Sequence, residues 1–200
     1  MKRSRYIGLL PLITALAWGA VAQGNPAAQT NRPDALVSSL YEQVVARHPL
    51  GVPYGADKKI FAPYLSKSLR RRFDLTKACF ADWRRQNPDP SLKPPSVLIE
   101  NGLFSGSAEE AEPTAFHIER TQSLKDGSSR VYVRLTWEDS VNKPFIWYVA
   151  AVVVPENSRL VVDDVFYLKS KVGDVESSLS QDLSSQCVNG HWVGNLPHLH

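Results

Sequence analysis

Apolar residues are densest between positions 144 and 169, and their pattern predicts two long neighbouring strands. Residues 145–154 (FIWYVAAVVV) are rich in valine and aromatic side chains, which fit a pleated strand better than a helical turn. The polar segment 155–158 (PENS) predicts a turn, because proline presets φ and asparagine tolerates the left-handed region. Residues 160–168 carry apolar side chains at both odd and even positions. We therefore expect a central strand pair that is covered on both faces over part of its length.

Two further strands are predicted before this hairpin. Residues 115–122 alternate, with Phe116 and Ile118 on one face, and residues 130–138 alternate again. The Asp126-Gly127 pair between them favours a tight hairpin turn, because both residues tolerate positive φ. The order and spacing predict an antiparallel meander.

Two helices are predicted ahead of the strands. The first spans 34–47 with Asp34 as its N-cap, and the second spans 66–86 with Ser66 as its N-cap. The glycines and proline of 50–59 predict a loop between them. The first helix has an apolar face with helical spacing, formed by Leu36, Val37, Leu40, Tyr41, Val44 and Val45. The inner stripe expected for the second is Leu69, Phe73, Phe80 and Trp83.

The remainder of the chain adds little regular structure. Val175, Leu179 and Leu183 suggest one short amphipathic helix, and we expect the tail 195–200 to be disordered. Helices followed by a meander predict an α+β fold, in which a curved antiparallel sheet of four or more strands packs on the N-terminal helices. Residues 34–194 are expected to form this single domain.

The first 22 residues have the pattern of a secretory signal peptide. Lys2, Arg3 and Arg5 form a basic start, an apolar run follows, and Ala20-Val21-Ala22 offers small residues at a cleavage site. A retained anchor helix is the alternative, but the apolar run is shorter than the ~20 residues that a membrane span needs. The polar segment 23–33 then forms a flexible leader. We expect a periplasmic or secreted protein without stable membrane insertion after cleavage.

The charge balance depends on that segment. The whole chain has 23 Lys and Arg against 20 Asp and Glu, a formal net charge of +3. Lys2, Arg3 and Arg5 carry this excess, so the chain after residue 22 is formally neutral. A neutral domain lacks the electrostatic basis of nucleic-acid binding, and we therefore expect a protein or a small molecule as partner.

Several stretches together resemble the bacterial exported family called domain of unknown function 3828. They are YLSKSLRRRF at 64–73, ENGLFSGSAEEAEPTAFHIE at 100–119, and LVVDDVFYLKSKVGDVESSLS with CVNGHWVG at 160–180 and 187–194. The resemblance covers about 34–194 and implies an NTF2-like, or cystatin-like, cone with a pocket, but no assigned activity. Family members carry Asp near 100–102, where this chain has Glu100, Asn101 and Gly102, which argues against a carboxylate site there.

Cys79 and Cys187 are predicted to form a disulfide. They are the two cysteines of the sequence, and export would place them in an oxidising compartment. Each cysteine has aromatic neighbours that favour packing against the folded domain. They are Phe80 and Trp83 beside Cys79, and Trp192 near Cys187. Two unpaired buried thiols are the alternative.

Candidate chemical groups are few, and each has a structural interpretation that we favour. The arginines of the second helix, at positions 70, 71, 72, 84 and 85, could bind an anion but fit a solvated face. Glu109, Glu110 and Glu112 lack the alternating ligand order of a calcium loop. The tail histidines His198 and His200, even with His191, fall short of a fixed zinc site. His117 and Glu119 share a strand face and fit a paired surface strand better than an acid–base pair. No metal or cofactor is predicted.

Two functions remain open from the sequence. The first is a non-catalytic binding or interaction module. The second is a small-molecule enzyme in which Asp163 or Asp164 acts as a general base inside the cone. The aromatic residues proposed to line that cavity are Tyr132, Trp137, Trp147 and Tyr148. Successive strand residues face opposite ways, so the two carboxylates are not expected to form a close pair.

The signal sequence gives a direct prediction. N-terminal sequencing of the protein purified from its native host should begin at Gln23 or within a few residues of it, because a signal peptidase cuts after small residues. A mature protein that begins at Met1 would contradict export by this signal.

Overall fold

The structure is a computed structural model that describes residues 31–94, 102–106, 112–138, 143–171 and 173–194. The predicted signal peptide, most of the leader 23–33 and the tail 195–200 lie outside these residues. The helices are α1 (Pro33–Arg47), α2 (Gly55–Phe61), the 3₁₀ turn η2 (Ala62–Tyr64), α3 (Lys67–Gln86) and α5 (Leu179–Ser184). The strands are β1 (Ala115–Ser123), β2 (Ser129–Trp137), β3 (Phe145–Glu156), β4 (Arg159–Leu168), β5 (Val175–Ser178), β6 (Cys187–Val188) and β7 (His191–Trp192). Among the described residues, no helix is long and apolar enough to cross a membrane.

The main sheet confirms the predicted meander. Its five strands lie in the order β1-β2-β3-β4-β5, and every neighbouring pair is antiparallel. The turn of the long hairpin is tighter than predicted, because Pro155 pairs with Leu160 and Glu156 pairs with Arg159. Only Asn157 and Ser158 remain for the turn, and both have positive φ, as two-residue hairpin turns of the primed type require.

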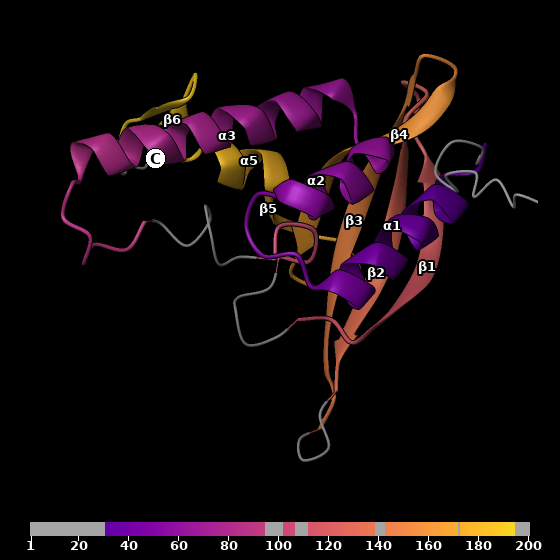
Figure 1. The fold of residues 1–200 in the computed structure, drawn as a ribbon. Coiled ribbons are helices and arrows are strands. Elements are labelled where there is room, and N and C mark those ends of the chain that lie inside the picture. The colour runs from indigo at the N-terminus through magenta and orange to yellow at the C-terminus, as the bar shows by residue number, and fades with distance from the viewer. Residues whose placement is uncertain (1–30, 95–101, 107–111, 139–142, 172, 195–200) are drawn as a thin grey trace, which may run out of the picture.

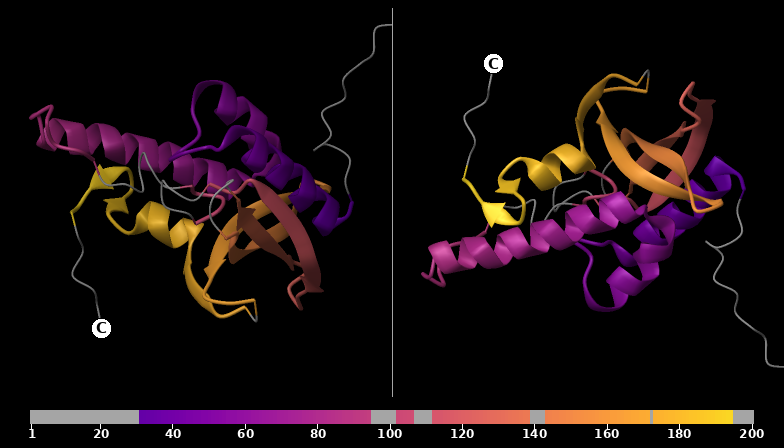
Figure 2. Two further views of the ribbon diagram at one scale, coloured as in Figure 1. Left: turned by 90° about the horizontal axis from the view of Figure 1, so that it is seen from below. Right: turned by 90° about the horizontal axis from the view of Figure 1, so that it is seen from above.

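The hydrophobic core lies between the helices and the inner, concave face of the sheet (Figures 1 and 2). Most of the predicted face of α1 is confirmed, since Leu36, Val37, Leu40, Tyr41 and Val44 are buried, whereas Val45 is only partly buried. From the sheet, Val131, Val133 and Leu135 of β2 meet Val149, Ala151 and Val153 of β3 in the same cluster. Burying each large side chain contributes roughly 1.5–3 kcal/mol, so this shared layer is the main source of stability. The protein is thus an α+β fold with a curved sheet packed on its N-terminal helices.

The start of α1 differs from the prediction. Asp34 lies in the first turn rather than at the N-cap, and its carboxylate pairs with the guanidinium of Arg32. Arg32 holds the N-cap position without a side-chain cap, and Pro33 begins the helix. Proline suits this position because the first N–H groups of a helix have no partner within the helix. Asp34, in the first turn, stabilises the helix through its dipole rather than as a cap.

The segment 50–59 is not a loop throughout, because α2 begins at Gly55. Two glycines and a proline in this segment favour a loop, so the sequence pattern does not predict this short helix. Phe61 at its end is completely buried. The chain then continues through η2 into Ser66, which caps α3 as predicted by accepting a hydrogen bond from the Leu69 N–H. The Ser66 N–H donates to the Val162 carbonyl, which ties the start of α3 to the sheet.

The C-terminal part also departs from the prediction of a single amphipathic helix. Val175 belongs to strand β5 and is exposed, whereas Leu179 and Leu183 lie in α5 and are buried. Phe80, expected on the inner stripe of α3, is only partly buried and lies under the guanidinium of Arg84.

A disulfide and a carboxylate fix the β6–β7 hairpin to α3. The predicted bridge is present, with the Cα atoms of Cys79 and Cys187 5.8 Å apart. The carboxylate of Asp82 accepts hydrogen bonds from the backbone N–H of Trp192 and from Arg85 and Gln86. The Trp192 N–H, with these side chains, holds the pKa of Asp82 below its usual value. The stabilisation from Asp82 is therefore present above the ordinary carboxyl pKa and is lost as the pH falls through the lowered one.

The disulfide predicts a large and specific loss of stability on its removal. In the variant C79A/C187A, the free energy of unfolding in a denaturant titration should fall by roughly 2–5 kcal/mol, because the bridge closes a long loop of the unfolded chain. The two cysteines are 108 positions apart, which places the bridge in the long-loop range. The exposed substitution Ser184→Ala serves as control, and a disulfide variant as stable as that control would contradict this role.

Candidate functional site

The concave interior of the sheet, where a pocket was expected, is filled by the segment 102–106. Leu103 and Phe104 are each 1% exposed and belong to the main core cluster. The Phe104 ring stacks on Phe61 with centroids 4.9 Å apart, and its centroid lies 6.1 Å from that of Phe73, edge to face. Side chains of the chain itself thus occupy the place of a ligand.

Three aromatic side chains bind consecutive carbonyl groups of this segment. The Tyr167 hydroxyl donates to the Leu103 carbonyl, the Tyr41 hydroxyl to that of Phe104, and Trp147 Nε1 to that of Ser105, at 2.7, 2.7 and 2.8 Å. Burial raises the pKa of both tyrosines, so each hydroxyl stays protonated and able to donate. The three hydrogen bonds satisfy backbone carbonyls that would otherwise be costly to bury.

Gly106 ends the segment at a position where a side chain does not fit. Its φ is +68°, and a Cβ there would lie 2.6 Å from the Tyr167 ring. A glycine is therefore required where the chain leaves the interior.

Asp163 and Asp164 line none of the three pockets found among the described residues. The pairing of β3 and β4 shifts at Asp163, so Val162 and Val165 both reach the core although they are three residues apart. Asp163 accepts a hydrogen bond from the Ser66 hydroxyl and so steadies the cap of α3. Asp164 accepts from the N–H groups of Val165 and Ser180. Asp163 thus links β4 to the start of α3, and Asp164 links β4 to α5.

The aromatic residues proposed to line the cone are not gathered on one face. Tyr132 and Tyr148 belong to a small cluster separate from the main core, whereas Trp147 packs against the main core and bonds to Ser105. Trp137 lies at the end of β2, opposite the exposed Phe145. The structure therefore does not bring these four rings together with either aspartate.

One carboxylate that the sequence did not single out lies close to Asp164. Asp182 of α5 is half-buried, and burial followed by the nearby charge of Asp164 raises its pKa. The Asp182 side chain also contributes to the raised pKa of Tyr167. No motif marks this residue, because its neighbours come from β4, which precedes it by a strand and a loop.

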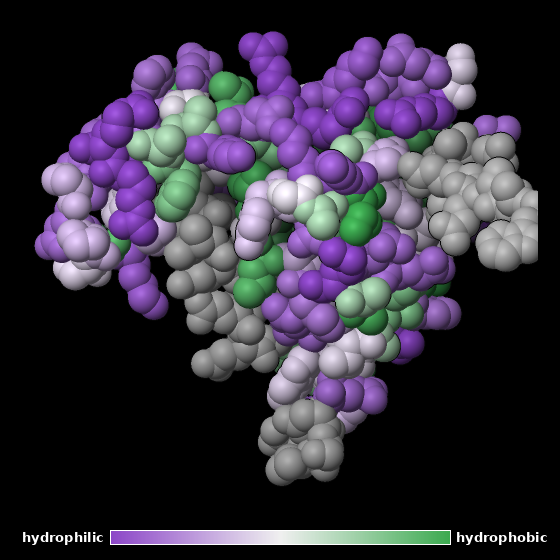
Figure 3. All heavy atoms as spheres, in the orientation of Figure 1, coloured by the Kyte–Doolittle hydropathy of each residue, from purple (hydrophilic) through white to green (hydrophobic). Residues whose placement is uncertain are grey.

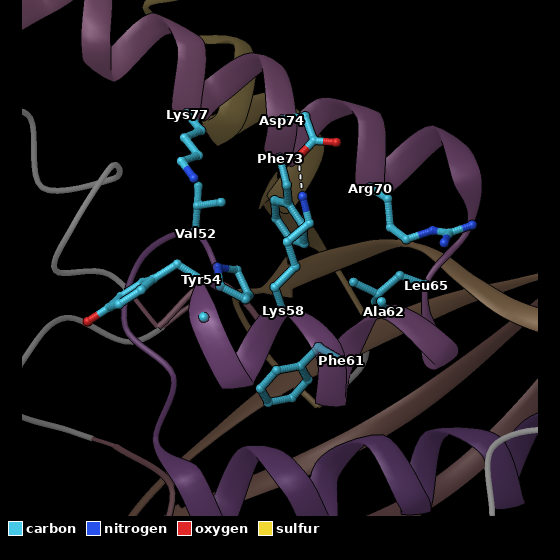
Figure 4. Close-up of a pocket in the computed structure, with 12 residues that line it drawn as sticks. Val52, Tyr54, Lys58, Phe61, Ala62, Leu65, Arg70, Phe73, Asp74 and Lys77 are labelled. Atoms are coloured by element: carbon cyan, nitrogen blue, oxygen red, sulfur yellow. Dashed lines mark hydrogen bonds and ion pairs between the residues drawn. The ribbon is translucent and has the colours of Figure 1, made fainter. Parts of the chain in front are cut away.

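A small pocket lies between α2 and α3 (Figure 4). Its apolar lining includes Val52, Phe61, Ala62, Leu65 and Phe73, and its volume is about 60 Å³. Figure 3 shows the face of the molecule in the orientation of Figure 1, which is largely hydrophilic with smaller hydrophobic areas between the helices.

Basic side chains predominate around this pocket. Lys58, Arg70 and Lys77 line it together with one acid, Asp74, which is 2.7 Å from Lys58 Nζ. The ammonium group of Lys77 extends toward Val52 and Tyr54 (Figure 4). Tyr54 is 74% exposed, which is unusual for so large a ring, and lies beside the opening. A pocket with an apolar lining and an excess of cations favours a ligand in which an apolar side chain stands next to a carboxylate.

A wider groove of about 310 Å³ lies between α3, α5 and the β6–β7 hairpin. Leu75, Leu183 and the disulfide residue Cys187 contribute its apolar part, and Thr76, Ser180, Ser184 and Asn189 its polar part. Arg72 is the one ionisable side chain among its lining residues. The groove therefore lacks the pair of titratable groups that acid–base chemistry needs.

The other predicted sites have structural partners. Glu119 pairs with Lys171 and Arg134 rather than with His117. Arg85 bonds to Asp82, and Arg70 bonds to the Ser66 carbonyl. Glu112 lies 2.9 Å from His48 Nδ1, whereas Glu109, Glu110, His198 and His200 are outside the described residues. Within the described part of the chain, no three His, Cys, Asp or Glu side chains are grouped to hold a metal ion.

Comparison of the chain with protein-family models, curated proteins and solved structures finds no match.

The filled interior gives a prediction that distinguishes packing from a ligand site. Phe104→Ala should lower the free energy of unfolding by about 3–5 kcal/mol, because it removes a completely buried ring and leaves a cavity. Phe145→Ala is the matched control, since that ring is 54% exposed and its loss should cost less than about 1 kcal/mol. Equal effects of the two truncations in denaturant titrations would show that Phe104 does not belong to the core.

Proposed function

We propose that this chain is an exported, non-catalytic interaction module of the NTF2-like type, related to the family called domain of unknown function 3828. Export is supported by the basic and apolar start of the sequence and by the Cys79–Cys187 disulfide, which suits an oxidising compartment. The NTF2-like assignment is supported by the curved sheet packed on N-terminal helices and by the motifs at 64–73, 100–119 and 160–180.

The observation that carries the non-catalytic function is the filled interior. Leu103 and Phe104 occupy the concave face, and three aromatic side chains bind the segment in place. Enzymes that act on small molecules usually enclose them in pockets of about 300–1,000 Å³. The α2–α3 pocket is several times smaller, at about 60 Å³, and matches a single side chain instead.

The enzyme alternative receives no support from the contacts of its candidate bases. Asp163 is bonded to the Ser66 hydroxyl and Asp164 to two backbone N–H groups. A general base needs a substrate proton within hydrogen-bond reach, and the described pockets include neither aspartate.

The α2–α3 pocket is the proposed contact point with a partner protein. Its apolar floor would receive one aliphatic side chain, and the excess of Lys58, Arg70 and Lys77 over Asp74 would favour a carboxylate next to that side chain. This one side chain would supply part of the binding free energy, and other residues of the partner would make further contacts around the pocket.

The test uses N-acetyl-leucine, which joins an aliphatic side chain to a carboxylate, titrated into the ¹⁵N-labelled chain from Gln23 onward. We expect chemical-shift changes centred on residues 52–77, and weaker binding of the uncharged N-acetyl-leucinamide. Lys77→Gln should weaken binding by roughly 1.5- to 5-fold, as expected for a surface ion pair. Ala62→Leu should abolish binding because the new side chain fills the pocket.

Lys59→Gln is the matched control, since Lys59 lies on α2 but does not line the pocket. Equal losses for Lys59→Gln and Lys77→Gln, or shift changes elsewhere in the chain, would contradict the assigned site. Shift changes centred on Asp163 and Asp164 would instead favour the enzyme alternative.

A further inference from the structure

The groove between α3, α5 and the β6–β7 hairpin, which we call the α3–α5 groove, has the size of a small-molecule site. Its volume of about 310 Å³ reaches the lower end of the usual range of about 300–1,000 Å³. Figures 1 and 2 show α5 and the hairpin side by side along α3. The α2–α3 pocket uses the other face of this helix, because Arg70, Phe73 and Lys77 lie roughly half a turn around it from Leu75.

The walls of the α3–α5 groove are fixed to each other. The disulfide between Cys79 and Cys187 fastens the β6–β7 hairpin to α3. The Thr76 hydroxyl of α3 lies 3.4 Å from the Leu183 carbonyl of α5, within hydrogen-bond distance. A ligand therefore meets a preformed groove, and little of its binding free energy is lost in ordering the protein.

Each of the three elements contributes an aliphatic side chain to the α3–α5 groove. They are Leu75 of α3, Leu183 of α5 and Val188 of β6. Leu183 is buried, whereas Val188 is 46% exposed, so apolar surface remains in contact with water here. A ligand with an aliphatic part would cover this surface, and the removal of apolar surface from water favours its binding.

Polar side chains of the α3–α5 groove include one cation and two neutral donors without partners. Within the described part of the chain, the side chains of Arg72, Ser180 and Asn189 form no hydrogen bond or ion pair. None of the described residues that line the groove is Asp or Glu, so no carboxylate there offsets the charge of Arg72. The groove therefore favours a ligand with one negative charge and hydrogen-bond acceptors.

We propose that the α3–α5 groove binds a small amphipathic monocarboxylate, whose aliphatic chain covers Leu75, Leu183 and Val188 while its carboxylate pairs with Arg72. The single cation of the groove matches a single carboxylate, and a guanidinium can bind both carboxylate oxygens. The volume of about 310 Å³, against about 60 Å³ for the α2–α3 pocket, suits a chain of several carbons rather than one amino-acid side chain.

Other anions fit the α3–α5 groove less well. A phosphate group or a polyanion is usually held by several cations or by the N–H groups at a helix N-terminus. Arg72 is the one cation here, and the Ser180 N–H at the start of α5 already donates to Asp164 Oδ1, 2.9 Å away. The lining has no pair of titratable groups, so the groove would hold its ligand without converting it.

The test titrates octanoate into the ¹⁵N-labelled chain from Gln23 onward and follows the amide chemical shifts. We expect shift changes centred on residues 72–76 and 180–189, with a Kd of roughly 1–10 mM for a ligand of about ten heavy atoms. Octanamide, which has the same chain without the charge, should bind roughly 2- to 5-fold more weakly. Butanoate should bind at least about 10-fold more weakly, because it lacks four methylene groups that each contribute up to about 4-fold when buried.

Two pairs of variants locate the site. Arg72→Gln should remove the difference between octanoate and octanamide, whereas Arg71→Gln, which is exposed but does not line the groove, should retain it. Ser184→Phe should abolish binding because the new ring fills the groove, whereas Ser185→Phe, at the next exposed position and outside the lining, should not. Thermal unfolding of each variant checks the fold, and Arg72→Gln remains informative if Ser184→Phe unfolds.

Several results would overturn the proposal. They are no shift changes up to about 30 mM octanoate, equal effects of Arg71→Gln and Arg72→Gln, or shift changes centred on residues 52–65. Equal affinities for octanoate and octanamide would assign the groove to a neutral apolar group instead. Ala62→Leu, which fills the α2–α3 pocket, should leave octanoate binding unchanged, so this result and that of the N-acetyl-leucine titration are independent.

Discussion

The inner face of the sheet must be covered along its length, and the rest of the structure depends on how this is done. Helix α1 covers part of it, and the segment 102–106 covers another part with Leu103 and Phe104. An irregular segment carries backbone carbonyls that regular structure does not satisfy. Three aromatic side chains donate hydrogen bonds to those carbonyls while their rings pack against the core. They are Tyr41, Trp147 and Tyr167.

Much of the fold follows from local patterns in the sequence. Alternation identified the strands of the meander, Ser66 marked the start of α3, and the two cysteines predicted their bridge. Helix α2 was missed because Gly51 and Pro53 precede it, Gly55 begins it, and its seven residues are too few to show a period. The segment 102–106 was missed for a different reason, since Leu103 and Phe104 are buried by partners distant in the sequence.

The faces taken by some strand residues depend on irregularities that alternation does not predict. By strict alternation, Arg120 would share the inner face with Phe116 and Ile118. The register shift between Ile118 and Arg120 turns it to the outer face, opposite Tyr132. A similar shift at Asp163 allows Val162 and Val165, three residues apart, both to reach the core. At both places a single extra residue in a strand changes which of the following side chains face the core.

The position of the two cysteines bears on how the chain matures. Cys79 lies in α3, which is made before any strand of the sheet, whereas Cys187 follows the whole meander. During synthesis, the earlier thiol has to stay unpaired until more than half of the described chain has emerged. Since the sequence contains two cysteines, one intramolecular pairing exists, and no reshuffling by a disulfide isomerase is needed to find it. The bridge therefore joins the end of the domain to a helix that is made before every strand of the main sheet.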